Sequence, residues 1–167
     1  MNKNYRGIVK SLTFRPFSTS SYPGVQPLLT TGSVGDLNLK NRLVMAALTR
    51  QKAKRDGEDR GVPTDLHVEY YSNRAADAGF ILTECSWIAK DGDAFPGSTG
   101  IANDQQVEGW KKVTEAVHRN DGHIFLQIWH GGRAAHPGQF GGEVTLSSSA
   151  KAISGKLWVN GQFVPHV

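Results

Sequence analysis

Cysteine is almost absent from this chain of 167 residues, because Cys85 is the only one. A single thiol cannot form an internal disulfide, so the composition argues against a disulfide-stapled secreted scaffold and permits a reducing compartment. Long apolar runs are absent as well. No stretch approaches the roughly 18 uninterrupted apolar residues of a membrane span, and we therefore expect neither a transmembrane helix nor a membrane partner.

Acidic residues are absent from the first 35 positions, which carry the whole excess of positive charge. That stretch contains Lys3, Arg6, Lys10 and Arg15, whereas residues 36–167 carry 15 basic and 15 acidic side chains. A body that is neutral by this count and has no basic stripe with interleaved aromatics does not favour nucleic-acid binding.

The N-terminal stretch has the composition of an organellar transit peptide, because it is basic, rich in hydroxyl side chains and free of carboxylates. Residues 15–18, Arg-Pro-Phe-Ser, also resemble a mitochondrial processing site. We therefore interpret residues 1–25 as a transit peptide or a disordered extension, and residues 26–167 as the folded part. This interpretation favours a mitochondrial location, and the alternative is a cytoplasmic protein.

Apolar runs of strand length alternate with helical patterns from residue 26 onward. Continuous runs predict buried strands at 43–49, 80–85 and 124–129. Helices are predicted from residue 63 or 64 to Ala78, with Gly79 ending the first, and from a capping Asp104 to about Asn120. Two hairpins flank these elements, one pairing 26–30 with 36–39 and one pairing 156–159 with 162–165 around Asn160-Gly161.

Near-continuous apolar strands that alternate with helices indicate βαβ units and a parallel sheet buried on both faces. The sequence has neither GxGxxG after a strand nor GxxxxGK[ST], which weakens a dinucleotide-binding interpretation. The other common parallel architecture is the (β/α)₈ barrel, which typically needs about 250 residues. The predicted fold class is therefore α/β, a partial (β/α)₈ TIM barrel. It comprises about the first three βα units, an N-terminal hairpin and a hairpin excursion after strand three.

Polar groups gather at the carboxyl ends of the predicted strands, where barrel enzymes place their chemistry. Alternation puts Gln127 and Trp129 on one face of the third strand, Thr49 at the end of the first, and Thr83 with Cys85 on the second. This neutral set suits a flat heteroaromatic with a pyrimidine-like edge, since an amide donates and accepts at once. The alternative is that Gln127 and Thr49 only satisfy backbone groups.

Four blocks resemble one family in the right order: LKNRLVMAALTR (39–50), EYYSNRAADAGFILTE (69–84), the QVEGWK helix (106–111) and FLQIWHGGRAA (125–135). Together with LSSSA and the closing hairpin, they resemble the N-terminal half of the Old Yellow Enzyme family over residues 26–167. The family consists of FMN-dependent NADH:flavin oxidoreductases of the ene-reductase type, which are TIM-barrel flavoproteins.

The resemblance implies a set of cofactor contacts. Ala47, Leu48 and Thr49 match the family segment that lies against FMN, with Thr49 bonding to the carbonyl edge of the flavin. Cys85 matches a small residue whose backbone approaches the flavin, and Gln127 matches the amide that binds the pyrimidine ring. Trp129 matches a residue that lines the substrate pocket. Ala47 replaces the usual proline, which affects the turn and removes no polar contact.

The same resemblance implies a reaction in which NAD(P)H reduces FMN, and the flavin then reduces the activated C=C bond of an α,β-unsaturated carbonyl. The partner is thus a small-molecule enone. The His-x-x-Asn or His-x-x-His pair and the tyrosine that act on it are expected beyond Val167, so we assign no catalytic residue in this chain. His130 and His136 do not match that pair, and no His or Cys spacing typical of a metal site occurs.

The sequence is compatible with two functions. The chain is the N-terminal fragment of an FMN-dependent oxidoreductase, incomplete for catalysis by itself, or it is a non-catalytic barrel remnant that acts through association with another protein. NADH and NADPH both remain open as the reductant, and the oligomeric state is likewise open.

Overall fold

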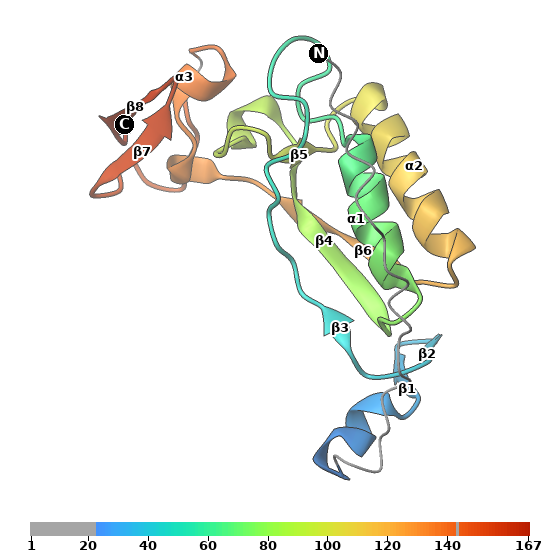
Figure 1. The fold of residues 1–167 in the computed structure, drawn as a ribbon. Helices are drawn as coiled ribbons and strands as arrows, with labels where there is room; N and C mark the ends of the chain where they lie inside the picture. The colour runs from blue at the N-terminus through green and yellow to red at the C-terminus, as the bar shows by residue number, and fades with distance from the viewer. Residues whose placement is uncertain (1–22, 143) are drawn as a thin grey trace, which may run out of the picture.

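A computed structural model describes residues 23–142 and 144–167 of the chain. Three parallel strands run side by side, β3 (Val44–Met45), β4 (Phe80–Trp87) and β6 (Ile124–Trp129), with β4 in the middle. Two helices, α1 (Asp65–Ala75) and α2 (Asp104–Arg119), lie together against one face of this sheet (Figure 1). The predicted order of strands and helices is therefore confirmed for these elements.

The core forms between the helices and the outward face of the sheet. Tyr71 and Ala75 of α1, Ile81 of β4 and Val113 of α2 are almost completely buried there, and Ile124 and Leu126 of β6 pack against them. Burying such apolar side chains is the main favourable contribution to folding. This contact fixes which face of each strand turns away from the helices.

Each helix begins at a residue whose side chain or backbone satisfies free amide groups. Thr64 precedes α1 and forms a capping box with His67, and the helix starts within two residues of the predicted position. For α2 the prediction of Asp104 as the cap is wrong by one residue, because the side chain of Asn103 accepts from the Gln106 amide at 2.9 Å. Asp104 instead occupies the first helical turn, where a negative charge suits the helix dipole.

The predicted glycine stop after α1 is also wrong in position. The helix ends at Ala75 with Ala76 as its cap, and Gly79 follows in the connection to β4. A Cβ atom at Gly79 would collide with the backbone carbonyl of Asn41, so glycine is required there for close approach of two chain segments.

The N-terminal hairpin is shorter than predicted and shifted along the chain. Residues 23–29 form a 3-10 helix, η2 (Pro23–Leu29), and the hairpin pairs β1 (Gly32–Val34) with β2 (Leu37–Leu39). The prediction of a strand over 26–30 is therefore wrong, and the turn falls at Gly35, whose φ of 57° suits glycine. The transit-peptide prediction rests on residues 1–22, which lie outside the described residues.

Lys40, directly after β2, attaches this hairpin to both helices. Its Nζ donates to the carbonyl oxygens of Ala75 at 3.2 Å and Ala76 at 3.0 Å, at the end of α1. It also donates to Asp121 O at 2.7 Å, just beyond α2. A cation at the carboxyl end of a helix satisfies free carbonyls and complements the helix dipole.

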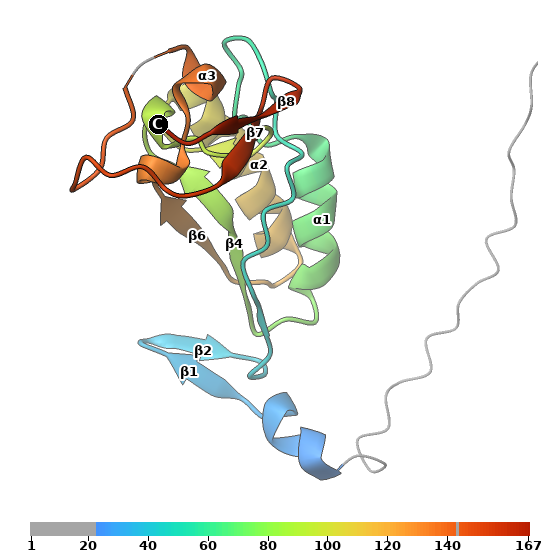
Figure 2. The same ribbon diagram turned by 90° about the vertical axis from the view of Figure 1, so that its left-hand side faces the viewer.

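The second hairpin, β7 (Lys156–Val159) with β8 (Gln162–Pro165), is confirmed in register around Asn160 and Gly161. Both turn residues have positive φ, 48° and 90°, as a two-residue hairpin turn requires. Figure 2 shows the two hairpins at opposite ends of the strands, with β7–β8 near the carboxyl ends of β4 and β6.

Several short elements carry no periodic signal in the sequence. They are β5 (Thr99–Gly100), which pairs with the end of β4, the 3-10 helices η3 (Lys90–Gly92) and η4 (Gly132–Ala134), and the one-turn helix α3 (Pro137–Phe140). No helix in the described part of the chain is both long enough and apolar enough to cross a membrane.

The sheet is open at both sides among the described residues. β3 pairs only with β4, and β6 likewise has no second strand neighbour. Apolar side chains are exposed along these strands, with Val44 and Phe125 more than a third exposed and Ile128 66% exposed. Such edges are ready to pair with further strands.

Candidate functional site

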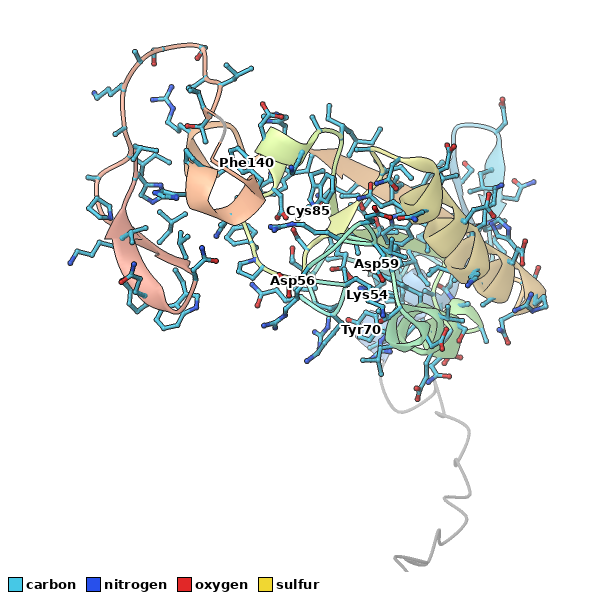
Figure 3. All side chains as sticks on the ribbon, turned by 90° about the horizontal axis from the view of Figure 1, so that it is seen from above. Lys54, Asp56, Asp59, Tyr70, Cys85 and Phe140 are labelled. Atoms are coloured by element: carbon cyan, nitrogen blue, oxygen red, sulfur yellow. The ribbon has the colours of Figure 1, made fainter. Side chains whose placement is uncertain are left out.

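The ends of the three parallel strands bring the predicted site residues together. Cys85 on β4 lies in register opposite Gln127 on β6, and its Sγ is 3.2 Å from the Thr49 Oγ1 in the segment after β3. Figure 3 looks onto this end of the sheet, with Cys85 between Phe140 and the loop that carries Lys54, Asp56 and Asp59. Thr49, Cys85 and Gln127 thus form one continuous group, which we call the strand-end site.

The inward face of β6 is the one that the alternation predicted. Ile124 and Leu126 pack on the helical core, so Phe125, Gln127 and Trp129 point to the opposite side of the sheet. The Gln127 side chain forms no hydrogen bond with any described residue, although its backbone N–H donates to Thr83 Oγ1 at 3.0 Å. Its amide is therefore available to a ligand, against the alternative that it only satisfies backbone groups.

The segment Ala47-Leu48-Thr49 reaches the site as extended chain and not as strand. The ladder of β3 ends at Met45, so the predicted strand over 43–49 is too long. Leu48 and Thr49 are exposed and Ala47 is half-buried, which leaves the backbone and the threonine hydroxyl accessible from the inward side.

Trp129 is held by a second aromatic ring that the sequence did not single out. Its ring stacks on that of Phe95 with centroids 5.6 Å apart and planes 7° apart. Phe95 comes from the glycine-rich connection between β4 and β5, where no periodic pattern marks a buried or functional position. Together the two rings form an apolar wall beside Gln127.

A buried ion pair fixes the connection that carries Phe95. Asp93 Oδ2 lies 2.6 Å from Arg60 Nη2, while its Oδ1 accepts from the Ser98 hydroxyl at 2.6 Å and the Phe95 amide at 3.2 Å. The carboxylate is thus fully bonded, as a buried charge must be. It joins the loop before α1 to the loop after β4.

Glu84, next to Cys85, is completely buried and points toward α1. One carboxylate oxygen accepts from the Tyr71 hydroxyl at 3.2 Å, and the other accepts from the Arg50 amide at 3.1 Å. His67 Nε2 lies 3.3 Å from the first oxygen, without a well-aligned hydrogen bond. Burial and the Glu84 charge raise the pKa of Tyr71, so its phenol stays protonated and donates.

A β-bulge explains how Glu84 and Cys85 face different ways. Leu82 is paired with Phe125 and Cys85 with Gln127, so three steps along β4 match two along β6. Thr83 and Glu84 lie between these two pairs, and the Thr83 hydroxyl accepts from the backbone N–H of Gln127 and donates to Glu84 O at 2.8 Å. The prediction that Thr83 and Cys85 simply share a face is therefore wrong, because strict alternation fails here.

Cys85 packs as a neutral thiol. Burial raises its pKa, and the negative charge of Glu84 acts in the same direction, whereas the hydrogen bond with Thr49 acts against both. A buried thiol with a raised pKa is a poor nucleophile at neutral pH.

The two histidines after β6 serve the local backbone. His130 Nδ1 accepts from the Gly132 amide and His136 Nδ1 from the Gly138 amide, both at 3.0 Å. Within 23–142 and 144–167, no three His, Cys, Asp or Glu side chains gather as a metal site would require.

Comparison with known proteins places this geometry in one family. The family model described as "NADH:flavin oxidoreductase / NADH oxidase family" matches residues 27–154. The flavin oxidoreductase hxnT of Emericella nidulans is 43% identical over 132 residues, which cover 79% of this chain and 34% of that protein. A probable flavin mononucleotide-dependent alkene reductase of Leishmania infantum is 42% identical over 132 residues, covering 78% of this chain and 34% of that protein.

Among solved structures, the old yellow enzyme homologue of Zymomonas mobilis is similar, with a TM-score of 0.77 and 37% identity. The match covers 84% of this chain and 38% of that chain, which agrees with the predicted partial barrel. The chain spans about a third of the length of the curated relatives it matches. On these grounds the chain belongs to the NADH:flavin oxidoreductase / NADH oxidase family, which includes the Old Yellow Enzymes that its motifs resemble.

Proposed function

We propose that the strand-end site binds the pyrimidine edge of FMN and serves an NAD(P)H-dependent reduction of the C=C bond in an α,β-unsaturated carbonyl. The observation that carries this proposal is the Gln127 amide, which has no partner among the described residues and lies beside Cys85 and Thr49. An amide complements the paired donor and acceptor atoms of a flavin edge. The Leishmania relative, described as a probable flavin mononucleotide-dependent alkene reductase, supports the same chemistry.

The residues present fit an FMN isoalloxazine ring. Gln127 would hold its pyrimidine ring, Thr49 would donate to a carbonyl of the ring, and the backbone at Ala47, Leu48 and Cys85 would lie against it. Trp129, stacked on Phe95, would line the substrate side. FMN, when bound, supplies the two-electron chemistry by accepting hydride from a nicotinamide and passing it to carbon.

The chain's own residues would orient the flavin and form an apolar surface beside it. The stacked Trp129 and Phe95 rings would give one side of the site an apolar surface, and the neutral thiol of Cys85 places no charge beside the ring. A neutral, apolar neighbourhood strengthens the few hydrogen bonds that remain.

A flavin titration of the purified chain tests the proposal. We expect FMN fluorescence to change saturably on addition of the chain, and Gln127→Leu to weaken binding about tenfold or more, because a hydrogen-bonded buried contact is lost. Gln162→Leu, an exposed glutamine on β8, is the matched control and should bind as the wild type does. Equal binding by the Gln127 variant would contradict the assignment.

A binding role is the second candidate, favoured by the open edges of β3 and β6. In this role the chain pairs with another protein and carries out no flavin chemistry. NAD(P)H-dependent reduction of an enone by the flavin-loaded protein would decide against it, whereas a stable complex that binds no FMN would support it.

We also propose mitochondrial targeting by residues 1–25, on the basic and acid-free composition alone. A fusion of the whole chain to a fluorescent protein tests this. A cytosolic product that keeps Met1 would contradict it.

A further inference from the structure

The bulge at Thr83 and Glu84 is linked to all three residues of the strand-end site. Hydrogen bonds connect it to Gln127 and to the peptide group after Thr49, and a peptide bond connects it to Cys85. We infer that this bulge is the positioning element of the proposed flavin site, and that the buried Glu84 carboxylate fixes Thr49 and Cys85 relative to each other. The inference rests on the proposed function for its ligand. It assigns roles to Thr83, Glu84 and Tyr71, which do not themselves reach the inward face.

Glu84 joins two segments that are distant in sequence. Its carboxylate accepts the Arg50 amide at 3.1 Å, and Arg50 directly follows Thr49. Its own peptide continues into Cys85. The 3.2 Å contact between Thr49 Oγ1 and Cys85 Sγ therefore lies within a ring of bonds closed by one carboxylate.

The carboxylate is itself fixed by α1. The Tyr71 hydroxyl accepts from the Glu84 amide at 2.8 Å and donates to the side chain of the same residue at 3.2 Å. His67 Nδ1 accepts from the Thr64 amide at 3.0 Å, and its Nε2 lies 3.3 Å from the Glu84 carboxylate. Position and orientation of Glu84 are thus set from the helix side.

Thr83, also on β4, connects the bulge to β6. Its hydroxyl accepts from the backbone N–H of Gln127 at 3.0 Å, in the place that a carbonyl oxygen would take in a regular ladder. The bulge therefore ties β4 to β6 at the residue whose side chain is to read the ligand. Bulges beside functional sites commonly redirect a side chain in this way.

The central experiment compares Glu84→Gln with Glu69→Gln, the same chemical change at an exposed position on α1. Backbone amide exchange by NMR reports the Arg50 N–H, with the Ala53 N–H, bonded to Gly97 O at 3.0 Å, as an internal reference. Alkylation of Cys85, the only thiol, reports the site without any flavin. FMN titration and the absorption spectrum of bound FMN report the ligand side.

We expect Glu84→Gln to speed exchange at Arg50 and alkylation of Cys85 about tenfold or more, because a charge-assisted bond becomes a weaker neutral one. Exchange at Ala53 should stay at the wild-type rate, and FMN should bind more weakly with a shifted spectrum. The Glu69 variant should match the wild type in every measurement.

If the Glu84→Gln variant does not fold, Tyr71→Phe replaces it in the same measurements. Tyr70→Phe, at the neighbouring position, is its control. Tyr71→Phe removes one hydroxyl from the carboxylate and should act in the same direction with a smaller effect. Wild-type rates at both Arg50 and Cys85 in the Glu84 and Tyr71 variants would overturn the inference. Equal acceleration at Arg50 and Ala53 would also overturn it, since that reports general loosening.

The two proposals fail separately. A wild-type chain that binds no FMN contradicts the proposed function, while the exchange and alkylation comparisons still decide the positioning role of the bulge. Wild-type FMN affinity and spectrum in a variant whose Arg50 amide has been released would overturn the inference and leave the proposed function standing.

Discussion

Asp93 carries the most complete set of side-chain bonds in the loops above the sheet. Its carboxylate is 2% exposed and pairs with Arg60, Ser98 and the Phe95 amide. We expect Asp93→Asn to lower the free energy of unfolding by about 3 kcal/mol, because it leaves the Arg60 guanidinium without its counter-charge. Urea denaturation measures this loss.

Asp59→Asn is the matched control for that prediction. Asp59 is 49% exposed and lies 3.7 Å from Lys54 Nζ, in a surface pair whose loss should cost less than about 1 kcal/mol. Equal losses in the two variants would show that burial does not distinguish the pairs.

Cys85 gives a prediction that depends on pH. Because its pKa is raised in the folded chain, alkylation should keep accelerating above the pH at which an unfolded thiol is already ionised. The unfolded chain releases this proton first, so stability should be constant at low pH and fall as the pH rises from the unfolded toward the folded pKa. Alkylation rates and urea midpoints between about pH 7 and 10 measure both effects.

Cys85→Ser is the control for the stability arm, since serine does not titrate there. A wild-type chain whose stability follows that of the serine variant across this range would contradict the raised pKa. The Thr49→Val variant should slow alkylation further, because the threonine hydrogen bond lowers the pKa of the thiol.

At the scale of the elements, the start of α2 separates the sequence prediction from the structure. Asn103→Ala should lower stability by about 1 kcal/mol, because the Gln106 amide loses its side-chain acceptor. Asp104→Ala should cost about half as much, through the helix dipole alone. Thermal unfolding of both variants checks the order, and a larger loss for the Asp104 variant would restore the sequence-based cap.

The elements that sequence predicts well are those with a strong local signal. β6 matches its predicted bounds because a continuous apolar run is closed by turn residues on both sides, and the Asn160-Gly161 turn sets the last hairpin. β3 was predicted too long, since an apolar run does not say where a partner strand stops pairing. The sequence predicts a strand over residues 26–30, where η2 lies, because a short apolar run fits the period of a strand or of a helix.

The residues of the candidate site likewise differ in how well the sequence predicts them. Gln127, Thr49 and Cys85 were predictable because they stand at strand ends and alternate in step with the core. Phe95 was not, because its position depends on a loop fixed by an ion pair with Arg60, distant in sequence. Glu84 carried a usable signal, a charged residue inside an apolar strand, but its direction depends on a bulge that alternation does not reveal.

At the scale of the whole molecule, the open edge of β6 predicts self-association. Ile128 is 66% exposed on a strand that lacks a second neighbour in the described chain. We expect Ile128→Lys to shift sedimentation toward the monomer, because a charge on an edge strand opposes pairing. Leu146→Lys, 65% exposed outside any strand, is the control and should sediment as the wild type does.

Concentration-independent, monomeric sedimentation of the wild-type chain would contradict this prediction. Added FMN provides a further contrast, since a ligand bound at the strand ends should leave an association through the β6 edge unchanged.

The three carbonyl groups that Lys40 binds are synthesised at different times. The ammonium group leaves the ribosome before any of the carbonyls that it binds, and the first two, on Ala75 and Ala76, emerge with the end of α1. The third, on Asp121, arrives only after the whole of α2. A chain that ends after α1 would therefore contain two of the three acceptors of Lys40, and the third requires the chain through Asp121.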